Sequence, residues 1–314
     1  MDKNILITGG AGFIGFHLNK ILQNQYNVSS IDSLNNQHIA SVIRSKSIIN
    51  LSKFDINDGF IDQLKTKPDV VVHLAAETGI AASLQYPEKY LIANIQGTFN
   101  VLEQCRKNGI KYLIYASSSS VYSPQQETCM HEQDSSDLQL SFYGTSKKMG
   151  EVMIENYCKQ YGITAIGLRF FTVYGSWTRP DMAAYKFMMQ IENKQPVTLY
   201  NDGYIFRDFT HVSDIVLAIS YLIKKIQSED AGLHQIFNLG YGTPISVKHY
   251  VDAIAKSMKS SVSYQFKKLP DNELAYTHCN NEKLNTYLGF KPRCSLLFGI
   301  DEMVNWFKNN KYEK

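Results

Sequence analysis

The sequence predicts an α/β fold in which a doubly wound parallel sheet is joined to a smaller, mixed α/β domain. Through the first half of the chain, apolar strand-like runs alternate with helical patterns, which is typical of a parallel sheet covered by helices on both faces. A glycine-rich turn directly after the first run strengthens this prediction. The runs that we expect to be strands are Asn4–Thr8, Val28–Asp32, Val70–Ala75, Tyr112–Ser117 and Ile163–Phe171.

Two long helical patterns, Tyr86–Asn108 and Ser146–Tyr161, separate the later strands. Pro87 suits a first helical turn, and Gly109 and Gly162 suit positions just beyond a helix end. After about residue 172 glycine and proline divide the chain into shorter elements. We therefore expect residues 1–172, with about 205–240, to form the sheet domain and residues 173–204 and 241–314 to form the second domain.

The first glycine-rich turn has the spacing of a dinucleotide-binding motif. Gly9, Gly12 and Gly15 follow a strand and open a helix that begins with Phe13 and Ile14. Such a turn lets the backbone approach a pyrophosphate, and the free N–H groups of the helix start favour an anion. The motif predicts a Rossmann domain that binds NAD through these five residues. The alternative is a plain glycine turn.

An acidic residue ends the second predicted strand. Asp32 lies 23 residues after Gly9, near the spacing expected for the carboxylate that binds the adenosine ribose. A carboxylate there favours NAD because it would repel the 2′-phosphate of NADP. The alternative is an exposed acid with no ligand.

Composition excludes several other classes of protein. The net charge of the 314 residues is only +3, which does not favour nucleic acid as a partner. The apolar runs are shorter than a membrane span, and we see no leader pattern. The five cysteines are scattered without CxxC spacing, which argues against a disulfide framework or a metal site. We expect a cytoplasmic protein.

A tyrosine and a lysine four residues apart form the candidate catalytic pair. Tyr143 and Lys147 share one face at a helix start, where an ammonium group and a bound NAD⁺ would favour the phenolate as a general base. The same spacing occurs three more times, so context selects this pair. A serine run, Ser117–Ser120, ends a predicted strand, where ligands bind in open α/β sheets. A polar loop is the alternative for that run.

Together these features resemble the extended short-chain dehydrogenase/reductase superfamily, in its nucleotide-sugar epimerase/dehydratase branch. The resemblance covers nearly the whole chain and includes Asp55-Ile56, His73–Ala76 and Arg207-Asp208-Phe209. It implies catalytic hydroxyls at Ser118 and Ser120 and substrate contacts at Ser118, Ser119 and Ser120. It also implies NAD contacts at Asp55, Ile56, Leu74, Ala75 and Ala76. The last three could instead be ordinary core, and Asp55 a surface acid.

The resemblance also suggests which reaction occurs. Dehydratases and decarboxylases of this branch resemble one another in an acid where this chain has Ser120, so we expect an epimerase. Tyr143 would remove the C4 hydroxyl proton as the C4 hydride passes to NAD⁺. The 4-keto sugar would turn over, and hydride return to its other face would invert C4 with no net redox change.

The segment after the fifth predicted strand looks like that of UDP-glucuronate 4-epimerases. By that resemblance Thr172 and Arg179 would hold the sugar carboxylate and Arg207 the diphosphate, whereas Arg169 is expected to be structural. Three of the six arginines fall between residues 169 and 207, which favours an anionic ligand. An exposed loop arginine is the alternative for Arg179.

Several positions depart from that family pattern. Glu77, Ala81 and Ala82 replace a usual glutamine and an Arg-Tyr pair, and Ser123 replaces a usual glycine. The first three predict a smaller and less cationic pocket wall. A UDP-glucose or UDP-N-acetylglucosamine 4-epimerase therefore stays open, as does a catalytically silent NAD-binding regulator. We expect a role in polysaccharide biosynthesis.

The two long helical patterns carry apolar residues on more than one face. The resemblance implies a homodimer in which these helices form a four-helix bundle; burial under a neighbouring domain is the alternative. The residues concerned are Tyr90, Leu91, Phe99, Leu102, Met149, Val152, Met153 and Tyr157.

Overall fold

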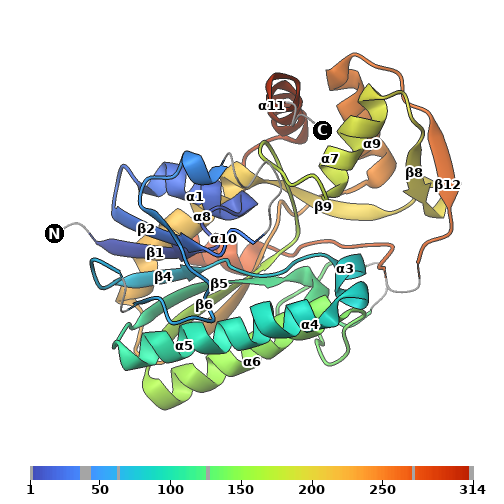
Figure 1. The fold of residues 1–314 in the computed structure, drawn as a ribbon. Helices are drawn as coiled ribbons and strands as arrows, with labels where there is room; N and C mark the ends of the chain where they lie inside the picture. Colours follow the sequence, from blue (N-terminus) through green and yellow to red (C-terminus); the bar gives the residue numbers. More distant parts are fainter. Residues whose placement is uncertain (1–2, 36–43, 62–63, 125–127, 271–272, 311–314) are drawn as a thin grey trace.

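The computed structural model describes residues 3–35, 44–61, 64–124, 128–270 and 273–310. Seven strands form one sheet, and each neighbouring pair in it runs parallel, as predicted (Figure 1). In spatial order they are β10 (His234–Leu239), β6 (Thr164–Phe170), β5 (Tyr112–Ser118), β4 (Val70–His73), β1 (Asn4–Thr8), β2 (Asn27–Asp32) and β3 (Leu51–Lys53).

The central strands are buried because helices cover both faces of the sheet. All residues of β4 and β6 are buried, which explains their continuous apolar runs. Helices α1 (Phe13–Leu22), α8 (Val212–Lys225) and α10 (Glu282–Leu288) lie together on one face. Helices α5 (Gly97–Lys107) and α6 (Phe142–Tyr161) lie side by side on the other face (Figure 1).

The strand order reverses between β1 and β4. From β1 the chain moves outward through β2 and β3, and then crosses to the other side of β1 to build β4, β5 and β6. In open parallel sheets, ligands bind at the carboxyl ends of the strands beside such a reversal. The fold therefore places a binding crevice where β1 and β4 end.

The remaining elements pack beyond the carboxyl ends of the large sheet (Figure 1). One small sheet has the order β11 (Pro244–Ser246), β9 (Phe206–His211), β7 (Thr172–Tyr174), and a second pairs β12 (Tyr264–Lys267) with β8 (Val197–Tyr200). A separate hydrophobic core joins them to three helices. These helices are α7 (Ala183–Glu192), α9 (Val247–Met258) and α11 (Leu296–Asn309).

The chain crosses between these two bodies more than once. Leu284 and Phe290, from α10 and the residue after its cap, are buried in the core beside the large sheet. This packing differs from our expectation that residues 241–314 lie together in the second domain. The apolar positions of α10 fit against β10 and α8, which explains the return of the chain.

The helix expected over Tyr86–Asn108 is interrupted. It consists of α4 (Pro87–Tyr90), the π-helical segment η2 (Leu91–Gln96) and α5. The apolar pattern runs through all three, so it does not reveal the extra residue that a π turn inserts. Among the described residues, no helix is both long and apolar enough to span a bilayer.

Candidate active site

The glycine-rich turn lies at the reversal in strand order and is too tightly packed for side chains. Gly9 has a φ of 72°, and a Cβ there would lie 2.7 Å from the backbone nitrogen of Ala75. A Cβ on Gly15 would lie 2.2 Å from the Gly9 carbonyl oxygen. Gly12 caps α1 without any side-chain hydrogen bond. The N–H groups at the start of α1, at Phe13 and Ile14, are thus open to an anion.

Asp32 stands beside this turn at the end of β2. Its carboxylate accepts hydrogen bonds from the N–H groups of Ala11 (3.0 Å) and Leu34 (2.9 Å). Burial raises the pKa of Asp32, while these backbone donors and the Arg44 cation act in the opposite direction. Each carboxylate oxygen can accept further bonds, so the position fits a ribose hydroxyl. With the open helix start, the residues present fit NAD.

The other expected cofactor residues follow β4 or lie in the segment after β3. Ala75 donates its N–H to the Thr8 hydroxyl (3.2 Å), and Leu74 and Ala75 are partly buried against the cores on opposite faces of the large sheet. Ala76 continues this half-buried segment. Ile56 is buried, with Gly97 packed closely on it, and Asp55 accepts two hydrogen bonds from Asn57.

The structure brings Tyr143 and Ser118 together. Ser118 ends β5 and is buried, and its side chain hydrogen-bonds that of Tyr143 in the first turn of α6. Ser119 and Ser120 lie in the following 3₁₀ turn, η3 (Ser119–Val121), and the Ser120 N–H donates to the Ser118 hydroxyl at 3.1 Å. A Cβ on Gly144 would lie 2.2 Å from the Ser120 carbonyl oxygen, so α6 begins against this turn.

Two nearby groups act on the ionisation of Tyr143. Burial raises its pKa, whereas the Ser118 hydrogen bond and the Arg179 cation lower it. Lys147 lies one turn along α6, and its ammonium donates to the Ala116 carbonyl at 3.0 Å. Burial lowers the pKa of Lys147 to about 8. Of these two cations, Arg179 is the one whose charge lowers the pKa of Tyr143 and so favours its phenolate.

Arg179 is held at this site rather than exposed on a loop. Its Nε and Nη2 donate to the two carboxylate oxygens of Asp181 (2.9 and 2.8 Å), and its Nη1 donates to the Thr78 hydroxyl (2.5 Å). Thr78 follows β4, so the contact joins the two bodies of the molecule. Asp181 was not singled out from the sequence, where it reads as a loop residue after proline.

The other residues expected to bind substrate lie apart from this cluster or show no side-chain contact with it. Thr172 opens β7, two residues beyond the partner of Ser118 in β6. Arg207 lies on β9, where it pairs with Glu273 at 3.1 Å. Burial lowers the pKa of Arg207 while Glu273 raises it. Arg169 forms a buried ion pair with Glu151 (2.9 Å), which fits the structural role expected for it.

The positions that depart from the family pattern also have places in the structure. Glu77 is half-buried, and its charge acts on Arg179. Ala81 and Ala82 lie exposed on α3 (Ile80–Gln85). The Ser123 hydroxyl accepts the N–H groups of Asp137 (3.1 Å) and Leu138 (3.0 Å), so serine anchors a loop at that position.

Sequence reasoning missed Asn94, which lies buried in the π-helical segment. Its amide bonds both backbone groups of Glu77 (2.8 and 3.0 Å) and donates to the Ser146 hydroxyl (2.9 Å) on α6. Asn94 thereby connects the segment that holds Arg179 to the helix that carries Tyr143. No spacing rule marks it, because its helix is apolar at regular intervals on either side.

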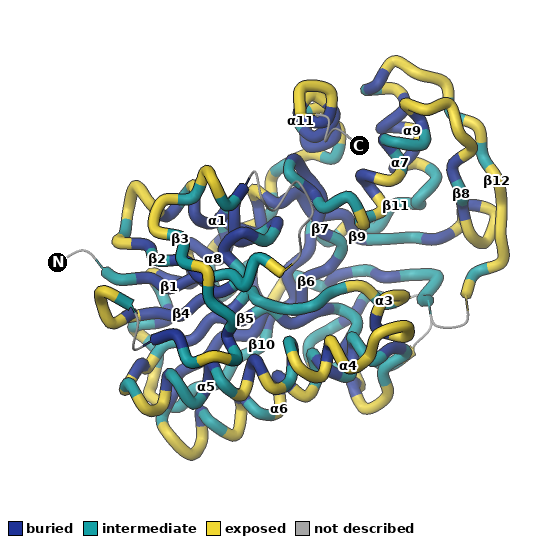
Figure 2. Tube along the Cα trace, in the orientation of Figure 1, coloured by how far each residue is buried: buried dark blue, intermediate teal, exposed yellow. Residues whose placement is uncertain are grey.

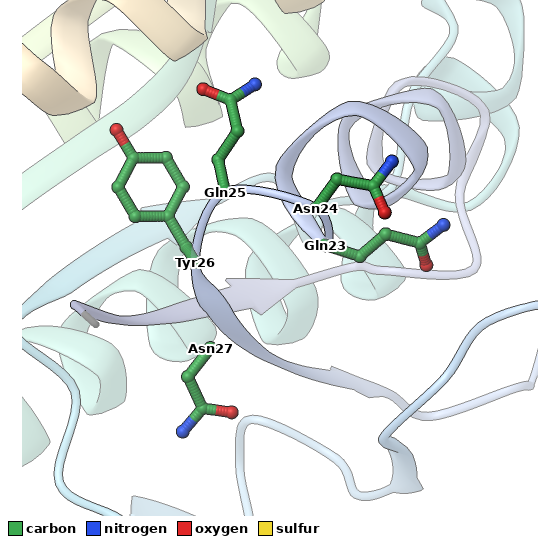
Figure 3. A pocket seen from close by; sticks show the side chains of 5 residues that line it. All are labelled: Gln23, Asn24, Gln25, Tyr26 and Asn27. Carbon is green, nitrogen blue, oxygen red and sulfur yellow. The ribbon is translucent and has the colours of Figure 1, made fainter.

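A polar hollow elsewhere on the surface does not belong to this site. It is lined by Gln23–Asn27, the turn between α1 and β2 (Figure 3). Asn27 begins β2, so this turn lies at the amino ends of the strands, at the sheet edge opposite the glycine-rich turn. Figure 2 shows buried positions along the strands of the large sheet and exposed positions along α5 and α6.

The chain is similar to known proteins over most of its length. Residues 5–240 match the NAD dependent epimerase/dehydratase family. Protein CapI of Staphylococcus aureus is 37% identical over 96% of this chain and 98% of its own. UDP-glucuronate 4-epimerase 1 of Arabidopsis thaliana is 33% identical over 97% of this chain and 76% of its own.

Solved structures of similar proteins include enzymes for acidic and neutral sugars. The UDP-glucuronic acid 4-epimerase of Bacillus cereus, in complex with UDP-glucuronic acid and NAD, has a TM-score of 0.90 and 30% identity, covering 98% of this chain and 99% of that one. The UDP-glucose 4-epimerase of Thermotoga maritima, with UDP-glucose, has a TM-score of 0.88 and 26% identity at the same coverage.

Proposed function

Because this chain belongs to the NAD-dependent epimerase/dehydratase family, we propose that it is an NAD-dependent UDP-sugar 4-epimerase, an isomerase, with UDP-glucuronate as its preferred substrate. The observation that carries this proposal is the cluster at the end of β5. There Tyr143 is hydrogen-bonded to Ser118 and faces the charge of Arg179. A base, a proton-relaying hydroxyl and a cation for an acidic sugar thus stand together.

Each residue of the cluster has a defined part in the reaction. Tyr143 takes the proton of the sugar C4 hydroxyl as the C4 hydride leaves, and later returns it. Ser118, bonded to Tyr143, relays this proton, and Ser119 and Ser120 contact the sugar. The ammonium group of Lys147, together with bound NAD⁺, favours the phenolate form of Tyr143. Thr172 and Arg179 hold the sugar carboxylate, and Arg207 binds the diphosphate.

The cofactor site is proposed on the glycine-rich turn. The pyrophosphate would bind at Gly12 and the start of α1, and the ribose hydroxyls at Asp32. Asp55 and Ile56 would border the adenine, and Leu74, Ala75 and Ala76 the path to the nicotinamide. Bound NAD supplies a hydride acceptor that returns the same hydride, so the enzyme needs no net oxidant.

The substrate is tested with NAD-loaded protein and three nucleotide sugars offered separately: UDP-glucuronate, UDP-glucose and UDP-N-acetylglucosamine. We expect NMR to show C4 inversion of UDP-glucuronate to UDP-galacturonate without loss of CO₂. We expect Tyr143→Phe to lower turnover by about 10³-fold, because the general base is removed, while NAD still binds. Inversion of neutral sugars alone would reject UDP-glucuronate as the substrate. Undiminished turnover by the variant would reject Tyr143 as the base.

A neutral UDP-sugar is the second candidate. It is favoured by the two carboxylates, Asp181 and Glu77, whose charges act on Arg179. These weaken the attraction of the site for another anion. The same substrate panel separates the two candidates.

We also propose a homodimer. Four of the residues expected at a helix–helix interface, Leu91, Phe99, Met149 and Val152, are between 42% and 55% exposed. Tyr90 and Leu102 are instead buried within the subunit. The exposed residues lie on η2, α5 and α6, which pack against one another, and a second copy of this face would complete a four-helix bundle.

The division into domains is proposed with one change. Residues 1–172 and about 205–240 form the NAD-binding domain, and α10 joins them. Residues 173–204 and the rest of 241–314 form the sugar-binding domain. Cytoplasmic location and a role in polysaccharide biosynthesis stay predictions; the five free cysteines are compatible with a reducing compartment.

A further inference from the structure

We propose that Asp181 is a built-in competitor for the acidic group of the substrate: its carboxylate pairs with Arg179 and sets how strongly the site prefers an acidic sugar to a neutral one. This inference rests on the proposed function, because it assigns Arg179 to the sugar carboxylate. It adds a specificity-determining residue that makes no direct contact with the reacting atoms.

The geometry of the pair is that of a bound carboxylate. Asp181 meets Arg179 through two parallel hydrogen bonds of 2.9 and 2.8 Å, one to each carboxylate oxygen. This bidentate arrangement is the one in which arginine recognises carboxylate ligands. The side chain two residues along the chain therefore mimics the group that the site is proposed to bind.

The rest of the arginine is anchored within the site. Its Nη1 donates to the Thr78 hydroxyl, and the Tyr90 hydroxyl bonds the carbonyl oxygens of Thr78 and Gly79 at 2.8 Å. The rings of Tyr90 and Tyr143 meet with their centroids 6.1 Å apart. The Thr78 contact thus holds Arg179 near the catalytic tyrosine, whereas its contact with Asp181 lies within the loop that carries both residues.

Exposure shows which partner can move. The side chain of Asp181 is 44% exposed, and that of Arg179 is 22% exposed. The Asp181 carboxylate is the more exposed partner, and an ion pair at that exposure is weak enough to be exchanged. Releasing Arg179 instead would also break its bond to Thr78. An incoming acid therefore displaces Asp181 rather than the arginine.

The charge of Asp181 also lowers the affinity for an acidic sugar if its side chain stays beside Arg179. The guanidinium has five N–H groups, and the contacts to Asp181 and Thr78 use three of them. A sugar carboxylate bound at the remaining edge would meet an arginine already neutralised by Asp181, with the Glu77 charge nearby. In both arrangements Asp181 weakens the binding of an acidic sugar and leaves that of a neutral sugar unchanged.

The test compares binding of UDP-glucuronate and UDP-glucose to NAD-loaded protein by calorimetry, with Tyr143→Phe as background to prevent turnover. In Asp181→Asn we expect the Kd for UDP-glucuronate to fall about 3- to 10-fold, the difference between a charged and a neutral hydrogen-bond partner. The Kd for UDP-glucose should stay within about twofold. Asp181→Ala should act in the same direction.

Asp252→Asn is the matched control. Asp252 lies on α9, is 46% exposed, forms an ion pair of 2.8 Å with Lys248 and accepts a hydrogen bond from the Tyr264 hydroxyl, so it resembles Asp181 in its exposure and in having a cationic partner. It should leave both Kd values unchanged. An unchanged or weaker affinity of Asp181→Asn for UDP-glucuronate, or equal shifts for both sugars, would overturn the inference. Wild-type protein that binds both sugars without inverting either would instead contradict the proposed function.

Discussion

At the residue scale, Lys147 shows the conflict between stability and chemistry at this site. Burial lowers the pKa of its ammonium from 10.5 to about 8, so the folded protein disfavours the charged form. Its one hydrogen bond, to the Ala116 carbonyl, does not neutralise that charge. A lysine that assists a phenolate must be kept where an uncharged side chain would be more stable.

We therefore expect Lys147→Met to stabilise the ligand-free protein while abolishing turnover. At pH 7 the lowered pKa corresponds to about 3 kcal/mol, and loss of the bond to Ala116 offsets about 1 kcal/mol of it, so the gain should be about 2 kcal/mol, or roughly 3 °C in Tm. Below pH 8 the lysine is charged in both states and the full cost applies; above about 10.5 it is neutral in both. The difference in Tm between variant and wild type should thus shrink as the pH rises from 8 towards 10.5.

Thermal unfolding at several pH values measures this difference, with Lys148→Met as the control. Lys148 is the next residue on α6, but it donates to Ser136 (2.7 Å) and lies 3.8 Å from Glu151. Its loss should lower Tm or leave it unchanged. A lower Tm for Lys147→Met at pH 7 would show that the bond to Ala116 outweighs the cost of burial.

The residues of the site were predictable where a backbone requirement or a fixed spacing marks them. Gly9 and Asp32 stand at set distances around a turn, and Tyr143 is paired with Lys147 along a helix. Asp181 and Asn94 were not predictable, because their roles depend on what the fold brings beside them. Thr78 and Arg179, which meet at Nη1, are 101 residues apart in the chain.

At the scale of elements, the π-helical segment is the feature that pattern reasoning could not supply. The apolar positions of Tyr86–Asn108 predict one helix, and the chain is helical from Pro87 to Lys107. The π turn places Asn94 inward, where it satisfies the N–H and C=O of Glu77 and reaches Ser146 on α6. Through Asn94, the π-helical segment η2 thereby supports α6, the helix that carries Tyr143.

We expect Asn94→Ala to lower both the free energy of unfolding and the kcat of the protein. Two backbone groups of Glu77 lose their partner, which costs about 1–3 kcal/mol for each group left unsatisfied. Because Glu77 precedes Thr78, kcat should also fall about 10-fold or more, as misplacement at a site is costly. Urea unfolding and initial rates with UDP-glucuronate measure the two effects.

Asn100→Ala is the control for this variant. Asn100 lies on α5 and makes a single amide bond to Asn57 at 3.0 Å, away from Glu77 and Ser146. It should lose less than about 1 kcal/mol of stability and keep its kcat. Equal losses in the two variants would mean that Asn94 is no more than a buried polar residue.

At the scale of the whole molecule, the large sheet was predictable because parallel strands are buried on both faces and read as continuous apolar runs. All five predicted strands exist: Asn4–Thr8 matches at both ends, and the ends of the others differ by at most two residues. The second half was harder to predict. β7, β8 and β11 have three or four residues each, and α10 returns to the first core. Such short elements contain too few residues to show a regular spacing of apolar side chains.

The exposed apolar face on η2, α5 and α6 leads to the last prediction. Phe99 is 44% exposed and Val152 is 55% exposed, and a second copy of the chain would cover both. A carboxylate buried in that interface without a partner is costly, so Phe99→Glu with Val152→Glu should give a monomer of 35.7 kDa while the wild type is a dimer. Tyr204→Glu is the control, since Tyr204 is 69% exposed but lies beside β9, outside this face. Light scattering coupled to size exclusion gives the masses, and a monomeric wild type or a control that also dissociates would contradict the proposed interface.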